Sequence, residues 1–170
     1  QRDLAAELLR SVGLEDDAVD RHPHQFSGGQ RQRLCIARAL SVKPKLIVAD
    51  EPVSALDVSI ARQVTDLMLE LQQREGISFL FISHDIAVVE RVSHRIAVMH
   101  RGEIVETGPS QAVLRDPRHA YTRRLLASVP RPDPAERWSA SRPLPAVAPA
   151  RPRARLFEVS PGHFVRESAA

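Results

Sequence analysis

The fold class follows from Leu46-Ile47-Val48-Ala49-Asp50-Glu51-Pro52, in which a short apolar run ends in two carboxylates and a proline. A short run that is apolar on both faces is typical of a strand buried in a parallel sheet. A second run, from Ile77 to Ile82, is also mostly apolar and is followed directly by Ser83-His84-Asp85. We therefore expect two buried strands with polar side chains at their carboxyl ends.

Helical patterns alternate with these strands. Ser27 has the character of an N-cap for a helix that ends near Leu40, and apolar residues recur at helical spacing between Asp57 and Arg74. Further short helices are expected at 86–92, 110–114 and 121–128, and a β-hairpin at 95–107 that turns at Arg101-Gly102. Strands that alternate with helices predict an α/β fold with parallel strands.

The composition changes from Pro130 onward, where eight of the thirteen prolines lie. Residues 138–155 are rich in Pro, Ala and Arg and show little periodicity, so we expect an extended or poorly ordered segment. The chain is thus divided into an α/β part at 1–108, a helical extension at 109–130, and a Pro/Arg-rich tail at 131–170.

The composition of the chain argues against nucleic-acid binding, an intrachain disulfide and a membrane-spanning helix. The formal net charge is only +3, and five Phe, one Tyr and one Trp leave few rings to stack on bases, so nucleic acid is not an expected partner. Cys35 is the only cysteine, which rules out an intrachain disulfide and fits a reducing compartment. We expect Cys35 to be a small core residue. No stretch approaches the roughly 20 apolar residues of a membrane-spanning helix.

The first candidate site is Ser27-Gly28-Gly29-Gln30, at the start of a predicted helix. Two glycines let a ligand approach the backbone closely, and the free N–H groups of a helix start favour an anion. The Ser27 hydroxyl can donate to a phosphate oxygen. For Ser-Gly-Gly alone an ordinary capped helix is the better explanation, but the longer string through Leu40 is more specific. Whether Arg31 and Arg33 order this loop or only solvate the helix stays open.

The second candidate site lies where the predicted strands end. Ligands gather at the carboxyl edge of parallel sheets, which is where Asp50, Glu51 and, one strand later, His84 are placed. Asp50 can hold Mg²⁺ through water, because this hard cation prefers oxygen ligands. Glu51 can polarise the water that attacks a γ-phosphorus, and His84 can hydrogen-bond the γ-phosphate and hold that water. An isolated Asp-Glu pair is usually a solvated strand end, but the residues that follow, through Asp57, favour the functional interpretation.

These sites together resemble the ATP-binding cassette (ABC) family. Ser27–Gln30 matches its signature, with Phe26 where leucine is commoner, Leu46–Glu51 matches the Walker B strand and catalytic glutamate, Ser54–Asp57 matches the D-loop, and His84 matches the switch histidine. The resemblance covers about residues 1–108 and implies a partial P-loop NTPase domain with part of its helical subdomain. It also implies ATP and Mg²⁺ as cofactors, with Glu51 and His84 catalytic. Nucleotide contacts are implied for Ser27, Gly28, Gly29, Gln30 and Asp57.

A narrower resemblance is carried by His22–Ser27, Glu51–Ser59, Pro117–Thr122 and Pro161–Val165, which look like the oligopeptide, dipeptide and nickel importer ATPases. In such importers two ATPase subunits drive a pair of membrane permease subunits, which an external solute-binding protein supplies. The resemblance implies a peripheral protein at the cytoplasmic face of the cell membrane that couples ATP hydrolysis to solute import. Peptides are the first expectation, and nickel, glutathione-like molecules and other small solutes stay open.

One part of the family pattern is absent. The phosphate-binding loop G-x-x-x-x-G-K-S/T (Walker A) does not occur, and neither Lys43 nor Lys45 follows a glycine. In the family each ATP lies between the Walker loop of one subunit and the signature of the other. This chain is therefore expected to offer its signature to a partner's ATP but to hold its own nucleotide poorly. We expect the full-length protein to be an ATPase and the 170-residue chain alone to be inactive.

Two alternatives belong to other classes. Chromosome-maintenance and DNA-repair ATPases share the signature, Walker B and D-loop, but would insert long coiled coils before the signature, and no sustained heptads occur here. A non-catalytic interaction fragment is the other alternative, because the Walker loop is absent.

Overall fold

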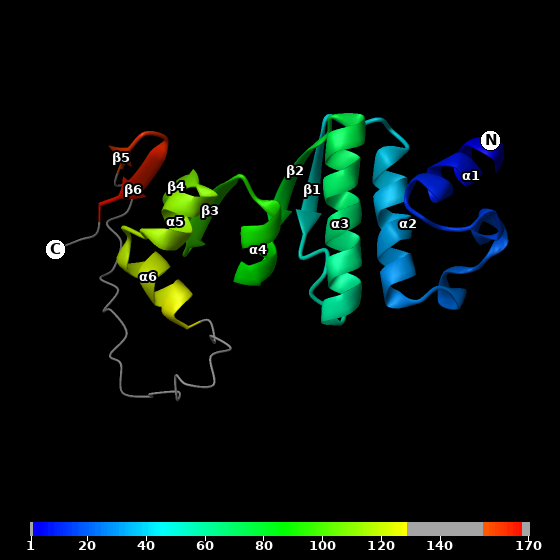
Figure 1. Cartoon of the computed structure of the whole chain (residues 1–170), viewed down its shortest axis with the longest axis horizontal. Helices are drawn as coiled ribbons and strands as arrows, with labels where there is room; N and C mark the ends of the chain where they lie inside the picture. Colours follow the sequence, from blue (N-terminus) through cyan, green and yellow to red (C-terminus); the bar gives the residue numbers. More distant parts are fainter. Residues whose placement is uncertain (1, 129–154, 168–170) are drawn as a thin grey trace. The chain divides into compact units, whose positions relative to one another are not determined.

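The computed structural model describes residues 2–128 and 155–167. Its elements fall into two compact units, Gln1–Val88 and Val89–Ala170, and each unit is described by itself (Figure 1). The division expected from the sequence, at residues 108 and 130, stays a prediction about the domains of the family.

Two parallel strands joined by a long helix form the centre of the first unit. β1 and β2 pair in parallel from Leu46↔Ser78 to Asp50↔Ile82, which confirms the expected α/β fold. α3 ends at Gly76, whose φ of 65° lies in the left-handed region that favours glycine. In chain order the elements are α1 (Arg2–Ser11), the 3-10 helices η1 (Asp16–Asp20) and η2 (Pro23–Gln25), α2 (Gly28–Leu40), β1 (Leu46–Asp50), α3 (Val58–Glu75) and β2 (Ser78–Ile82).

A hydrophobic core lies between this sheet and the helices. Figure 1 shows α3 beside the strands, with α2 and then α1 farther from them. Ala49 of β1 faces the core, and Phe79 and Phe81 of β2 pack against it. Val64 and Leu71, from one face of α3, are completely buried, so α3 is the central helix of the core.

The strands differ from the prediction in one respect, because both are exposed on one face. Leu46 and Val48 of β1 and Leu80 and Ile82 of β2 are 46–58% exposed. The register places these four side chains on the same side of the sheet. Within the described residues the helices cover only the opposite side, so the expectation of fully buried strands is wrong for this chain. The apolar pattern on both faces is nevertheless that of a sheet covered on both sides.

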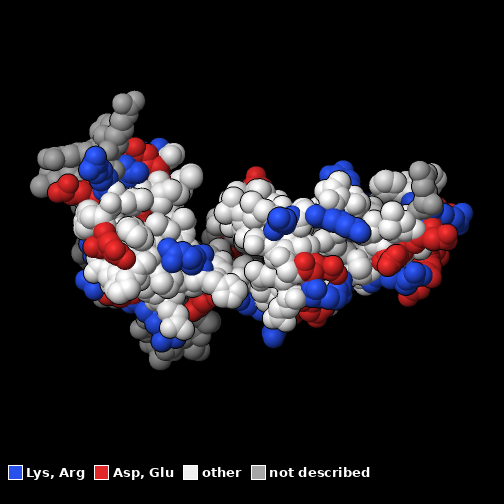
Figure 2. All heavy atoms as spheres, turned by 90° about the horizontal axis from the view of Figure 1, so that it is seen from above, with Lys and Arg blue, Asp and Glu red and all other residues white. Residues whose placement is uncertain are grey.

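Charged residues around α1 are paired with residues of opposite sign. Arg10 contacts both carboxylate oxygens of Asp16 at 3.0 Å, and Arg2 pairs with Asp20. Figure 2 shows basic and acidic side chains next to one another in this region. Exposed pairs of this kind contribute little to stability, so α1 is held mainly by its buried leucine, Leu9, and by Val12.

The second unit contains an antiparallel sheet with strand order β3-β4-β6-β5. The predicted hairpin is confirmed, and it turns at Arg101-Gly102, where both residues have positive φ. The three short helices expected from the sequence are also present. In chain order the elements are α4 (Ile86–Val92, across the unit boundary), β3 (Arg95–His100), β4 (Glu103–Pro109), α5 (Ser110–Arg115), α6 (Ala120–Ala127), β5 (Leu156–Ser160) and β6 (His163–Arg166).

The end of the tail is structured, which the sequence analysis missed. β5 and β6 form a hairpin around Gly162, and β6 pairs with β4 through Glu106↔Val165 and Thr107↔Phe164. Gly108 permits this approach, since a Cβ there would lie 3.0 Å from Cδ2 of His163. The extended segment expected at 138–155 lies outside the described residues except for Arg155.

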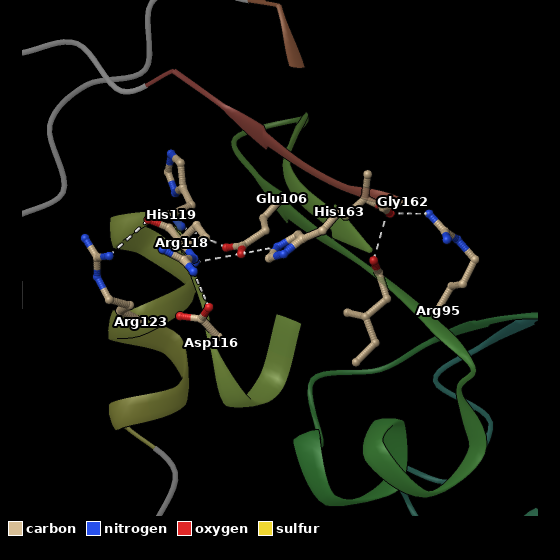
Figure 3. Close-up of polar contacts among 10 residues, drawn as sticks. Arg95, Glu106, Asp116, Arg118, His119, Arg123, Gly162 and His163 are labelled. Carbon is tan, nitrogen blue, oxygen red and sulfur yellow. Dashed lines mark hydrogen bonds and ion pairs between the residues drawn. The ribbon is translucent and has the colours of Figure 1, made fainter. Parts of the chain in front are cut away.

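A buried carboxylate on β4 binds both the start of α6 and the hairpin of β5 and β6 (Figure 3). Glu106 of β4 is 0% exposed, and its Oε1 accepts hydrogen bonds from the Arg118 N–H and from Nε2 of His163, both at 2.8 Å. Its Oε2 accepts from the His119 N–H at 2.9 Å. Glu106 therefore ties the start of α6 and the carboxy-terminal hairpin to the same strand.

His119 adds a pH-dependent contribution to the stability of this unit. Burial lowers the pKa of His119 below its ordinary value of 6.5, although the Glu106 carboxylate opposes the shift; the positive charges of His100, Arg123 and Arg166 lower it further. His119 thus binds a proton more readily in the unfolded chain than in the folded chain. The stability contributed by neutral His119 is present above pH 6.5 and is lost as the pH falls below that value towards the folded pKa.

We predict that His119→Asn reduces this pH dependence. Asparagine retains a side-chain acceptor for the Tyr121 N–H, which His119 Nδ1 now caps at 3.1 Å, but it does not titrate. Thermal unfolding of the full-length protein between about pH 8 and about pH 5.5 measures the effect. The wild type should lose more stability than the variant over this range, and an equal loss would contradict the assignment to His119.

Candidate functional site

The structure brings Glu51 and His84 into direct contact. Glu51 follows β1 and His84 lies two residues after β2, so the parallel pairing places both at one edge of the sheet. His84 Nδ1 lies 2.9 Å from Glu51 Oε1, and the two side chains are 75% and 48% exposed. A carboxylate only accepts, so the shared proton is on Nδ1 and Nε2 of His84 faces away from the pair. The two residues predicted to be catalytic thus form one accessible acid–base pair.

The backbone at Glu51 is held in an unusual conformation. Its φ is +44°, in the left-handed region that a non-glycine residue seldom adopts. Three hydrogen bonds fix it there: its N–H donates to the Ile82 carbonyl at 2.9 Å, and its carbonyl accepts from the Ser54 N–H and hydroxyl at 3.3 and 3.1 Å. Buried Val53 anchors the turn that follows. Strain of this kind is found at functional sites, where it fixes a side chain in one direction.

Asp50 ends β1 and is exposed on the uncovered side of the sheet. Among the described residues its carboxylate has no hydrogen bond or ion pair. No group of three or more His, Cys, Asp or Glu that could hold a metal occurs in the described ranges. A single exposed carboxylate fits a Mg²⁺ ion that keeps most of its ligands from other sources such as water.

The signature segment caps its own helix. Ser27 Oγ accepts from the Gln30 N–H at 3.3 Å, and Gln30 Oε1 accepts from the Ser27 N–H at 3.0 Å, which is a complete capping box. The predicted N-cap at Ser27 is confirmed. Because Ser27 Oγ accepts in this cap, its hydroxyl proton remains available. The donors left for an anion are this hydroxyl, the N–H groups of Gly28 and Gly29, and the side-chain NH₂ of Gln30, of which only Oε1 is used within the loop.

The glycines of the signature also have a packing role. A Cβ on Gly29 would lie 2.4 Å from Cγ2 of Ile60, and a Cβ on Gly28 would lie 3.2 Å from Cδ2 of Leu56. The start of α2 thus lies directly against Leu56 and the first turn of α3. Asp57, expected to contact nucleotide, caps α3 by accepting from the Ile60 N–H at 3.0 Å, so its nucleotide role stays a prediction.

We predict that Gly29→Ala destabilises the protein by about 1–3 kcal/mol, because the added methyl group overlaps Ile60. Gly28→Ala is the matched control and should cost less, since the end of the Leu56 side chain can move. Combining Gly29→Ala with Ile60→Ala removes the overlapping methyl group. A double-mutant cycle from thermal unfolding should therefore show coupling between the two sites, and strict additivity would contradict this packing.

Two arginines of α2 support the loops before it. Arg31 Nε donates to the carbonyls of Pro23 and Phe26 at 3.1 and 3.0 Å, and Arg33 Nη1 donates to the Val12 carbonyl at 2.8 Å. The question left open by the sequence is answered for Arg31, which orders the loop before Ser27, whereas Arg33 bonds the Val12 carbonyl, outside that loop. Cys35, predicted to be a core residue, is exposed instead, since the buried face of α2 is formed by Ile36, Ala37 and Leu40.

The two candidate sites lie on different elements, the start of α2 and the carboxyl ends of β1 and β2. Among the described residues, no hydrogen bond or ion pair connects Ser27–Gln30 with Asp50, Glu51 or His84. One site presents an acid–base pair next to a free carboxylate, and the other presents hydroxyl and backbone donors for an anion. Such groups are of the kind that phosphate chemistry requires.

Comparison with known proteins finds transporter families and relatives that match different parts of the chain. A family model described as ABC transporter matches residues 1–54, and one described as oligopeptide/dipeptide transporter, C-terminal region, matches residues 105–154. The chain is 54% identical over 166 residues to the glutathione import ATP-binding protein GsiA of Pectobacterium atrosepticum, covering 93% of this chain and 27% of that protein. It is 52% identical over 166 residues to the dipeptide transport ATP-binding protein DppF of Lactococcus lactis subsp. cremoris, covering 96% and 53%.

A solved structure shows the same fold. An ATP-binding cassette of an ABC transporter, in its ADP conformation, superposes with a TM-score of 0.61 at 34% identity over 68% of this chain and 46% of that one. This chain therefore spans only a part of the relatives and structures that it matches.

Proposed function

Because this chain belongs to the ABC transporter ATPases of the oligopeptide/dipeptide type, we propose that it is part of the ATP-hydrolysing motor subunit of a peptide importer. The observation that carries the proposal is the contact between Glu51 and His84, at the sheet edge next to Asp50, whose carboxylate has no partner within residues 2–128 and 155–167. This arrangement supplies a base, a group that orients it, and a carboxylate for a nucleotide-borne cation.

In the proposed reaction the Glu51 carboxylate accepts a hydrogen bond from the attacking water and polarises that water. His84 holds the Glu51 carboxylate through Nδ1 and directs Nε2 outward, where its protonated form can donate to a γ-phosphate oxygen. Asp50 would hold Mg²⁺ through water, and the ion would supply neutralisation of phosphate charge. The strained backbone of Glu51 keeps its carboxylate at the edge without reorganisation during the reaction.

The signature residues act on a second nucleotide in this proposal. The Ser27 hydroxyl and the N–H groups of Gly28 and Gly29 would donate to the phosphates of an ATP held by a partner ATPase subunit. The position of the two sites on different elements, the start of α2 and the carboxyl ends of β1 and β2, supports such sharing. We further propose a homo- or heterodimer of ATPase subunits that acts with membrane permease subunits and, indirectly, with a solute-binding protein.

The proposed location is the cytoplasmic face of the cell membrane, as a peripheral subunit. Within residues 2–128 and 155–167, no helix is long and apolar enough to cross a bilayer. The uncovered side of β1 and β2 supports a longer functional protein, because strands apolar on both faces are covered on both sides in α/β proteins. The relatives reported above favour transport over the chromosome-maintenance alternative.

Peptides are the proposed substrates, with short peptides such as dipeptides and glutathione as the first to test. Proteoliposomes that contain the full-length protein, its permease subunits and its solute-binding protein should accumulate a labelled dipeptide or glutathione only when ATP is inside with the motor. Labelled Ni²⁺ serves as the competing solute. Uptake of Ni²⁺ alone would contradict the peptide assignment, and ATP hydrolysis without uptake of any solute would contradict the transport role.

A further inference from the structure

The loop that leads into the signature is built as a rigid unit. η2 begins with a capping box in which Gln25 Oε1 accepts from the His22 N–H at 2.7 Å. Phe26, immediately before Ser27, is 4% exposed and belongs to the core. A second capping box, between Ser27 and Gln30, follows directly. Two caps in succession and one buried anchor thus determine where Ser27 lies.

Arg31 closes this unit from the helix side. It lies in the first turn of α2, and its Nε donates to two backbone carbonyls of the loop, those of Pro23 and Phe26. The Phe26 carbonyl belongs to the residue next to Ser27, so the guanidinium binds within one residue of the proposed phosphate donor. Charge-assisted hydrogen bonds to carbonyls are stronger than neutral ones, and the planar guanidinium fixes their direction.

From these contacts we infer that Arg31 is a positioning residue of the signature site. It does not need to touch the nucleotide; it holds the carbonyls of Pro23 and Phe26 so that the Ser27 hydroxyl and the Gly28 and Gly29 N–H groups meet the partner's ATP in one arrangement. This inference rests on the proposed function, because it assigns a role in presenting the signature to a second nucleotide. Without Arg31 the loop keeps its caps but loses the tie between η2 and α2.

Arg31→Gln in the full-length protein tests the inference, with Arg38→Gln as the matched control. Arg38 is exposed on the same helix, and its side chain has no described hydrogen bond, so its removal changes the charge of α2 equally and leaves the loop intact. The measurements are steady-state ATP hydrolysis and hydrogen exchange of the amides at 22–27. We expect Arg31→Gln to lower kcat by about 10-fold or more, as loss of a charged hydrogen bond predicts, with little change in KM for ATP. Exchange at 22–27 should rise at the same time.

Arg31→Lys separates positioning from general charge. Lysine retains the positive charge but lacks the Nε–H that Arg31 shares between the two carbonyls, so we expect an intermediate kcat and intermediate exchange. Three results would overturn the inference: unchanged kcat and exchange in Arg31→Gln, an equal loss of kcat in Arg38→Gln, or a rise in KM for ATP at constant kcat, which would indicate direct binding. Absence of turnover in the wild type would instead refute the proposed function, so the two failures are distinguishable.

Discussion

Replacing Glu51 by glutamine is expected to reduce ATP hydrolysis by the full-length protein by about 10²–10⁴-fold, the usual contribution of a general base. The amide has nearly the shape of the carboxylate but cannot accept a proton from water. In the wild type, His84 Nδ1 lies 2.9 Å from a Glu51 carboxylate oxygen; in the variant it would face a neutral amide group. ATP binding should be retained, because no nucleotide contact is assigned to Glu51. Steady-state phosphate release and equilibrium binding of labelled ATP measure the two properties.

Glu70→Gln is the control for this substitution. Glu70 lies on α3, is exposed and has no described ion pair. Its replacement by glutamine removes the same charge from the same unit and leaves the sheet edge unchanged. His84→Ala should also reduce turnover strongly, since it removes the group that holds Glu51. Turnover in Glu51→Gln near the wild-type rate would show that another group activates the water and that the Glu51–His84 pair is not catalytic.

The largest expected effect on stability comes from Glu106→Ala in the second unit. This change leaves the buried His163 ring and the Arg118 and His119 N–H groups without their acceptor. Leaving a buried hydrogen-bond donor without its acceptor typically costs about 1–3 kcal/mol, and here three donors lose theirs. The hairpin of β5 and β6 should lose its attachment first, because its pairing with β4 spans only Glu106↔Val165 and Thr107↔Phe164. Hydrogen exchange of amides in β6, measured in the full-length protein, reports this loss.

Glu103→Gln provides the comparison on the same strand. Glu103 lies 3.6 Å from Arg166 and its side chain is 30% exposed, so its loss should cost less than the loss of completely buried Glu106. Glu106→Gln should lie between the two, because its amide oxygen can still accept from the backbone. Protection of β6 that is unchanged in Glu106→Ala would contradict the role of Glu106 as the attachment point.

The sequence predicted those parts of the molecule whose cause is local. Ser27 and Asp57 are strong caps, and Gly76 is a strong stop, so the helices between them could be placed from their own residues. The contact between Glu51 and His84 could also be predicted from the sequence, since residues at the carboxyl ends of neighbouring parallel strands share an edge.

Features that depend on residues far apart in the sequence could not be predicted in this way. Glu106 and His163 are 57 positions apart, and no periodic pattern marks either of them. β5 and β6 become strands because β4 offers an edge, and the proline-rich sequence before them suggested an unstructured tail. The exposure of Cys35 depended on the rotation of α2 about its axis, which neighbours of similar apolarity did not determine. The positive φ of Glu51 is set by bonds to Ile82 and Ser54, and nothing in its own residue type predicts it.

The most direct test of the account is ATP hydrolysis in the presence of Mg²⁺, measured side by side for the full-length protein and for the 170-residue chain. The account predicts turnover by the full-length protein and none above background for the chain, because the chain has the Glu51–His84 pair and the signature but no Walker loop. Turnover by the chain alone would contradict the assignment of its two sites to separate nucleotides. Absence of turnover in the full-length protein, with or without its permease subunits, would contradict the assignment of this chain to a transport motor.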